Sequence, residues 1–170
     1  SDDLKKLGFH KVGQNCHISE QCIIVGEKNI SLGNNIRIDS FVSIIAVSGY
    51  LKIVNNVHIG SYCHLVCNGG IEIDSFAGLS QGVKLYSSSD DYSGKGLTNP
   101  TIPNQYKNVI TKKIEIKKHT IIGSGSVILP GVTLAEGTSI GANSVIRKST
   151  KEFTFYNGNP ARVVGPRSKY

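Results

Sequence analysis

The 170-residue sequence predicts an all-β solenoid, in which short strands stack on one another. The first observation behind this prediction is a six-residue period: aliphatic residues recur without a slip at Ile116, Ile122, Ile128, Leu134, Ile140 and Ile146. The second is that the fifth position of each hexad carries a small or β-branched residue. A period of six suits a strand of about four residues and a turn of about two, and it does not suit an α-helix.

The same period appears earlier in the chain, in four shorter runs. One hexad is too small to bury its own apolar residue, so stacking the hexads is what gives these residues a common interior. The register is interrupted at 25–31, 45–52 and 66–72, and for longest at about 86–113. The runs open at Val12, Ile18 and Ile24; at Leu32, Ile38 and Ile44; at Ile53, Ile59 and Leu65; and at Ile73, Leu79 and Leu85.

Residues 1–11 precede the repeat. Leu4 and Leu7 favour a short amphipathic helix from Ser1 to Phe9 that ends near Gly8. The sequence shows no signal-peptide pattern at its start and no apolar run long enough to span a membrane. We therefore expect no integral membrane segment.

The interruption at 86–113 is longer than a solenoid needs. Irregular insertions of this length are usually functional or disordered. This one contains Tyr92, Leu97, Ile102 and Tyr106 together with two prolines, which are enough apolar and rigid residues to pack against a surface. We therefore expect an ordered functional loop.

Charge and cysteine content narrow the function classes. The net charge is +7, and many of the cations lie late in the chain, but no nucleic-acid-binding motif or aromatic ladder accompanies them. A few cations on one surface suit a phosphorylated cofactor better. Cys16, Cys22 and Cys63 occupy fifth hexad positions and are expected to be small buried residues. With Cys67 they are expected to be free thiols, as in a reducing cytoplasm.

The hexad pattern resembles that of the hexapeptide-repeat acyltransferases: an aliphatic residue, usually followed by glycine or another small residue, with a small or β-branched residue at the fifth position. The resemblance covers residues 12–150. It implies a left-handed parallel β-helix of triangular section with three hexads per coil, followed by a C-terminal extension at 151–170. It also implies a homotrimer whose active sites lie between subunits, with the loop at about 86–113 reaching a neighbour.

Three segments make the resemblance more specific: SDDYSG, LTNPTIP and, near the end, NPARVV. They resemble acetyltransferases that modify sugars during bacterial surface-polysaccharide synthesis, such as that of lipopolysaccharide and O-antigen. The resemblance implies acetyl-CoA as the acyl donor. The expected acceptor is the amino group of a nucleotide-linked amino sugar, and the alternatives are a glycan hydroxyl or a binding solenoid without catalytic activity.

The candidate base differs from that of many relatives, which have a histidine in the corresponding loop. This loop contains no histidine, and Asp90 or Asp91 takes that place. A hydroxyl acceptor needs a base whose pKa lies near the working pH, whereas the usual pKa of aspartate is about 3.9. A neutral amine attacks a thioester unaided, so the aspartates favour N-acetylation. Burial could raise the pKa of an aspartate, and both residues could also be turn residues.

Histidines outside the loop offer an alternative base but not a metal site. His64 is the best alternative base, because an interruption begins just after it. His58 and His64 are one hexad apart and so lie on different faces of a triangular coil, which argues against the three-histidine zinc site of a γ-class carbonic anhydrase. The sequence contains no CxxC pair, so no metal is expected.

The resemblance also assigns coenzyme and acceptor contacts. In the family the pantetheine arm follows late coils, and cations near the C-terminus hold the phosphates. Asn68 corresponds to an acceptor contact of related enzymes, although an asparagine before two glycines is also an ordinary turn. Tyr92 of the loop is a further candidate acceptor contact. The candidate coenzyme contacts are Ser124, Ala142, Arg147, Lys148 and Arg162.

Overall fold

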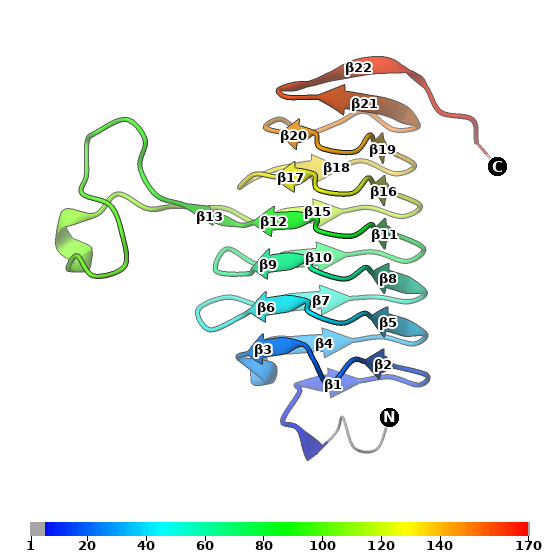
Figure 1. The fold of residues 1–170 in the computed structure, drawn as a ribbon, viewed down its shortest axis with the longest axis horizontal. Helices are drawn as coiled ribbons and strands as arrows, with labels where there is room; N and C mark the ends of the chain where they lie inside the picture. Colours follow the sequence, from blue (N-terminus) through cyan, green and yellow to red (C-terminus); the bar gives the residue numbers. More distant parts are fainter. Residues whose placement is uncertain (1–5, 170) are drawn as a thin grey trace.

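The computed structural model describes residues 6–169, which form a β-solenoid of stacked coils (Figure 1) with three parallel sheets as its sides. The chain climbs as a left-handed coil and visits three parallel sheets in turn. The fold predicted from the hexads is therefore confirmed, including three hexads per coil. The handedness departs from the right-handed rule for parallel crossovers.

The strands are short, and each sheet contains one strand from every coil. Sheet A consists of β1 (Lys11–Val12), β4 (Ile30–Leu32), β7 (Leu51–Ile53), β10 (Ile71–Ile73), β15 (Ile114–Ile116) and β18 (Thr133–Leu134). Sheet B consists of β2 (His17–Ile18), β5 (Ile36–Ile38), β8 (Val57–Ile59), β11 (Gly78–Leu79), β16 (Ile121–Ile122), β19 (Ser139–Ile140), β21 (Thr154–Gly158) and β22 (Ala161–Pro166). Sheet C consists of β3 (Ile23–Val25), β6 (Ser43–Ile45), β9 (His64–Val66), β12 (Lys84–Tyr86), β17 (Val127–Ile128) and β20 (Val145–Ile146).

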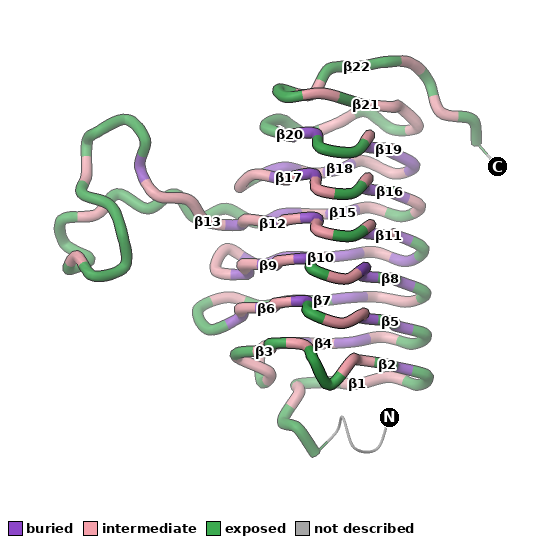
Figure 2. Tube along the Cα trace, in the orientation of Figure 1, coloured by how far each residue is buried: buried purple, intermediate pink, exposed green. Residues whose placement is uncertain are grey.

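The core is a column of aliphatic side chains inside the coils (Figure 2). Strand alternation explains it, because in β8 Val57 and Ile59 are buried while His58 between them is exposed. The stacked register keeps equivalent positions in line, as where Ile38 pairs with Ile59. Cys22 is only half-buried, since the first coil has no complete coil beneath it.

Three columns of turns join the sheets, and we name them the A–B, B–C and C–A edges. The interruptions at 25–31, 45–52, 66–72 and 86–113 all fall on the C–A edge. The first contains the 3₁₀ helix η1 (Glu27–Asn29). Extra residues are tolerated there because each C–A turn can bulge outwards without disturbing the strands on either side.

The longest interruption forms an excursion between β12 and β15 that projects away from the solenoid (Figure 1). Its base is an antiparallel pair, β13 (Ser88–Ser89) and β14 (Ile110–Thr111), and its outer part contains η2 (Asn104–Tyr106). The backbone amide of Leu97 donates to the carbonyl of Tyr106 at 2.8 Å, so the tip is closed by its own hydrogen bonds.

The two ends of the solenoid differ. At the C-terminal end, β21 pairs with β19, and β22 returns antiparallel beside it, which covers the last coil. At the other end, the helix expected from Ser1 to Phe9 lies largely outside the described residues. Of the described part, Lys6 is helical and a turn follows it. No helix within residues 6–169 is long and apolar enough to cross a membrane.

Candidate functional site

The outer faces of the three sheets differ in character. Sheet A presents charged and polar side chains such as Lys52, Glu72 and Glu115. Sheet C presents mostly apolar ones, and Ile23 and Val25 are 62% and 41% exposed. Monomeric proteins rarely leave a contiguous apolar face in water, so sheet C has the character of a surface that another molecule covers.

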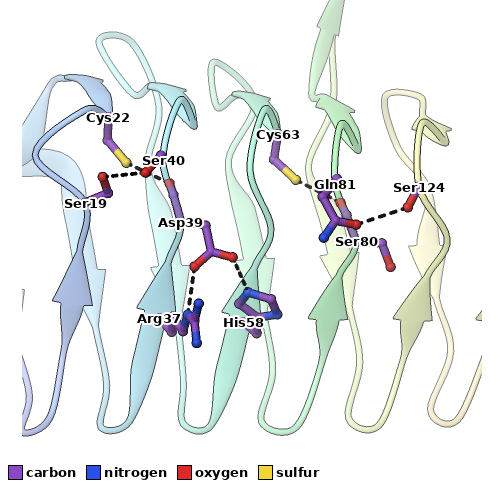
Figure 3. Close-up of polar contacts among 10 residues, drawn as sticks. All are labelled: Ser19, Cys22, Arg37, Asp39, Ser40, His58, Cys63, Ser80, Gln81 and Ser124. Carbon is purple, nitrogen blue, oxygen red and sulfur yellow. Dashed lines mark hydrogen bonds and ion pairs between the residues drawn. The ribbon is translucent and has the colours of Figure 1, made fainter.

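The B–C edge borders sheet C and carries a row of small polar residues (Figure 3). Ser19 and Ser40 share a hydrogen bond of 2.9 Å, and further along the edge Ser124 donates to Gln81 at 3.3 Å. Ala142 occupies the equivalent place one coil beyond Ser124 and is exposed. Because stacked strands are about 4.8 Å apart, the row forms a narrow track parallel to the solenoid axis.

The two candidate aspartates of the excursion have different environments. The carboxylate of Asp91 is buried and accepts backbone hydrogen bonds from Ser93 at 2.8 Å and Gly96 at 2.9 Å. Hydrogen bonds from the side chain and backbone of Ser93 hold the pKa of Asp91 below its usual range. Asp90 is half-buried, and its carboxylate accepts a 3.4 Å hydrogen bond from the backbone of Asn99. Asp91 therefore organises the loop, and Asp90 is the carboxylate more available to a substrate.

Replacing Asp91 by asparagine is expected to loosen the excursion, because an amide cannot accept hydrogen bonds at both of its terminal atoms as the carboxylate does. Limited proteolysis should then cut the excursion faster, with the solenoid intact. In the wild-type protein the pKa of Asp91 is lowered in the folded state. The carboxylate therefore orders the excursion at neutral pH, and this effect is lost as the pH falls below about 4. Unchanged proteolysis of the Asp91→Asn variant would show that these hydrogen bonds do not order the loop.

His64 lies on the outer face of sheet C, away from the excursion's aspartates in sequence. Its ring makes an edge contact with Tyr86, with centroids 5.8 Å apart. Burial first, and the neighbouring Lys84 second, lower the pKa of His64. The imidazole is therefore neutral near pH 7 and retains a nitrogen able to accept a proton.

The two candidate acceptor contacts are placed differently. Asn68 donates to Ser88 at 3.1 Å, so it connects the turn after β9 to the base of the excursion. Tyr92 is 94% exposed and lines a cavity of about 770 Å³. Tyr86, Lys112 and Arg147 also line that cavity, which lies beside the base of the excursion.

The candidate coenzyme contacts fall into two groups on different edges of one subunit. Arg147, Lys148 and Arg162 line a cavity of about 370 Å³ at the end of β20. Ser124 and Ala142 lie on the B–C edge instead. One subunit therefore does not bring all five residues to a single surface.

The structure also shows a cluster that sequence reasoning missed. On the outer face of sheet B, Asp39 accepts a hydrogen bond of 2.7 Å from Arg37 and forms a 2.7 Å contact with His58 (Figure 3). The contact with His58 and then that with Arg37 lower the pKa of Asp39. Arg37 and Asp39 are two residues apart in one coil, and His58 comes from the next coil, where its outward register places it beside Asp39. Among residues 6–169, no group of three or more His, Cys, Asp or Glu side chains is arranged to hold a metal ion.

Comparisons with known proteins agree with this architecture. The family described as "Bacterial transferase hexapeptide (six repeats)" matches residues 113–148. An Escherichia coli dTDP-4-amino-4,6-dideoxy-D-glucose acyltransferase is 42% identical over 166 residues, which is 98% of this chain and 86% of that protein. A putative lipopolysaccharide biosynthesis O-acetyl transferase, WbbJ of E. coli K12, is 24% identical over 89% of this chain and 79% of its own.

Solved structures of AntD, an N-acyltransferase from Bacillus cereus, are also similar. One, in complex with dTDP-4-amino-4,6-dideoxyglucose and coenzyme A, has a TM-score of 0.95 and 41% identity, covering 99% of this chain and 89% of that one. Another contains dTDP and 3-hydroxybutyryl-CoA and has a TM-score of 0.94 with 43% identity, covering 98% and 88%. Several of these structures carry a replacement at one serine or at one aspartate, and the two positions are ten residues apart.

Proposed function

Because the chain belongs to the hexapeptide-repeat acyltransferases, we propose that it transfers the acetyl group of acetyl-CoA to the amino group of a dTDP-linked amino sugar. The similarity that carries this proposal extends over nearly the whole chain, at 42% identity to an acyltransferase of such a sugar. The product would serve the synthesis of a bacterial surface polysaccharide, such as the O-antigen of lipopolysaccharide. The reaction would take place in the cytoplasm, and the four free cysteines suit a reducing compartment.

The active form is a homotrimer in which sheet C of each subunit faces the three-fold axis. The exposed apolar side chains of sheet C support this arrangement, since burying them is what drives association. In a cyclic trimer each contact is heterologous, so one border of sheet C meets the other border on the next subunit. The B–C edge of one subunit then lies beside the C–A edge of its neighbour, where the excursion emerges.

This arrangement brings Asp90 of one subunit to the B–C edge of the next. Within a single chain, Ser80 lies in the turn before β12, whereas Asp90 lies in the excursion that leaves the other end of β12 (Figure 1). In this sequence Ser80 and Asp90 are the only serine and aspartate with the order and ten-residue spacing of the pair replaced in AntD. That correspondence supports Ser80 and Asp90 as members of one active site between subunits.

The chemistry needs one proton acceptor and a bound thioester. Asp90 orients the acceptor amine, whose lone pair attacks the carbonyl carbon of acetyl-CoA. A C–N bond forms, the nitrogen gives its proton to the carboxylate, and the C–S bond breaks to release the coenzyme A thiolate. The hydroxyl of Ser80 can donate a hydrogen bond to the thioester oxygen, which becomes negative during the attack.

The coenzyme would lie between subunits, which explains why its candidate contacts are on two edges. Ser124 and Ala142 on the B–C edge border the pantetheine arm, and Ala142 leaves space for it. Arg147, Lys148 and Arg162 of the neighbouring subunit face the phosphates, which arginine and lysine bind well. Tyr92 and Asn68 are proposed to contact the acceptor, and of these only Tyr92 is free of a structural bond among the residues described.

An acceptor comparison tests the proposed function. With acetyl-CoA, the protein should acetylate dTDP-4-amino-4,6-dideoxyglucose and leave dTDP-glucose, which offers only hydroxyls, unmodified. The rate should rise with pH as the acceptor amine loses its proton, because only the neutral amine is nucleophilic. Mass spectrometry of the products gives the answer, and 3-hydroxybutyryl-CoA in place of acetyl-CoA reports on the choice of acyl group.

O-acetylation is the second candidate function. The neutral imidazole of His64 and the similarity to WbbJ favour it. If the wild-type protein acetylates dTDP-glucose and a His64→Ala variant does not, the function is O-acetylation and the proposal of N-acetylation is wrong. A binding solenoid without catalysis would leave every acceptor unmodified and show no acetyl-CoA binding by calorimetry.

A further inference from the structure

We propose that the B–C edge of the first three coils holds the nucleoside diphosphate of the acceptor, with Phe41 and Tyr62 as the platform for the base and Arg37 as the main phosphate ligand. This inference rests on the proposed function and adds a subsite to it. It concerns a surface that the catalytic step itself does not use.

A cavity of about 500 Å³ lies at this end of the edge, lined among others by His17, Ser19, Arg37, Asp39 and Ser61. Ser124 and Ala142, the proposed coenzyme contacts, lie on the same edge, and Ser80 lies between them and this cavity. With the acyl donor entering from that side, an acceptor must approach from the first coils. Ser40 lies two coils from Ser80, and at about 4.8 Å per coil the separation along the axis is roughly 10 Å. A sugar ring and a diphosphate fit within that length.

The aromatic platform is a feature of this part of the edge alone. Phe41 and Tyr62 stack with centroids 5.1 Å apart, and they are 49% and 64% exposed. Both have a left-handed backbone, with φ of 63°. At the same turn position, later coils have Gly82, Gly125 and Asn143, which are the residue types that accept this conformation readily.

Two bulky aromatic residues are therefore held in a strained conformation while much of their surface stays in water. Backbone strain of this kind is often found at ligand sites, because the fold can maintain it for a function. Exposed aromatic rings are the usual platform for a nucleobase, which stacks on them through its own π face.

The arginine beside the platform is positioned for phosphate. Asp39 binds the Nε atom of Arg37 at 2.7 Å and so fixes the direction of the guanidinium group. The two terminal nitrogens remain able to bind an anion, and the forked group matches the oxygens of a phosphate. Asp39 also contacts His58 at 2.7 Å, and His17 lines the same cavity, so imidazole groups flank the arginine.

The neighbouring subunit is the competing occupant of this edge. The outer face of sheet C is mostly apolar, whereas the cavity beside Phe41 and Tyr62 is lined mainly by polar and charged side chains. A largely polar lining that contains an arginine, beside an exposed aromatic pair, matches a nucleotide better than it matches an apolar protein surface. The stability of the trimer in variants of these residues distinguishes a bound nucleotide from a bound neighbouring subunit.

Calorimetric titration of dTDP into the full-length protein tests the inference. Phe41→Asn, Tyr62→Asn and Arg37→Gln should each weaken dTDP binding about tenfold, a factor within the range for one stacking or phosphate contact. Asparagine tolerates the left-handed backbone, so the two aromatic variants should melt no lower than the wild type. Arg37→Gln should also narrow the difference in affinity between dTDP and dTMP, which the aromatic variants should leave unchanged.

Phe76→Asn is the matched control. Phe76 is also an exposed aromatic residue with a φ of 62°, and it stacks on His119, but it lies on the A–B edge. Its replacement should leave dTDP affinity unchanged.

Wild-type affinity in the Phe41→Asn and Arg37→Gln variants would overturn the subsite while leaving the proposed function intact. So would dissociation of the Phe41→Asn trimer in light scattering. If the wild-type protein fails to bind dTDP and acetylates no dTDP-linked amine, the proposed function itself fails.

Discussion

Replacing Asp90 by asparagine should lower kcat for acetyl transfer to the amine by roughly 10²–10⁴-fold, the range that a positioned acid or base contributes. The asparagine has nearly the same shape and can still contact the acceptor, but it cannot accept the proton that the nitrogen must lose. Acetyl-CoA binding and the melting temperature should stay at the wild-type values, because among residues 6–169 the carboxylate of Asp90 makes only one long hydrogen bond. Steady-state kinetics, calorimetry of acetyl-CoA binding and thermal melting measure these three quantities.

His64→Ala is the matched comparison for Asp90→Asn. His64 is neutral near pH 7 and could act as a base, so its replacement tests the rival assignment directly. We expect the His64→Ala variant to retain most of its activity towards the amine. An inactive His64→Ala variant beside a fully active Asp90→Asn variant would transfer the role of base to the histidine. If both variants kept full activity, neither residue would be the base.

Mixing two inactive variants should restore activity if the active sites lie between subunits. One variant is Asp90→Asn, and the other is Ala142→Trp, whose indole would fill the exposed place of the pantetheine arm on the B–C edge. Each variant alone should be nearly inactive. After unfolding and refolding together in equal amounts, an interface works only when one subunit provides Asp90 and its neighbour provides Ala142. Random assembly gives this combination at roughly one quarter of the interfaces of a cyclic oligomer.

Size-exclusion chromatography with light scattering establishes that the mixed species is a trimer. The control is the same mixture made from separately refolded proteins that have not exchanged subunits, which should stay inactive. Recovered activity near one quarter of the wild-type value supports a site built from two subunits. An absence of recovery in mixed trimers would mean that Asp90 and Ala142 act in the same chain, contrary to the arrangement proposed from sheet C.

The sequence alone is sufficient to predict the solenoid because the signal is repeated many times. A single aliphatic residue such as Ile59 carries little information, but the same residue class at every sixth position leaves only one way to bury them all. The excursion is also visible in the sequence, since the period stops after Leu85 and resumes at Ile116. Handedness required the resemblance to a family, because either hand gives the same period.

The candidate site was less accessible from the sequence. Asp90 and Asp91 are adjacent and chemically identical, and only the hydrogen bonds from Ser93 and Gly96 show that Asp91 orders the loop. Ser80 resembles many other serines in the chain. Phe41 and Tyr62 carry the one signal that could have been noticed, because they are aromatic at the hexad position where later coils have glycine or asparagine.

By itself, therefore, the sequence determined the coil, its core and the presence of an inserted segment, since a periodic pattern of burial is a one-dimensional property. The tertiary structure decided which residues share an edge and which face is left apolar. His58 meets the Arg37–Asp39 pair because the next coil places its outward-facing strand position beside that of Arg37. Such proximity depends on the stacking of coils in three dimensions, and no local pattern of residues records it.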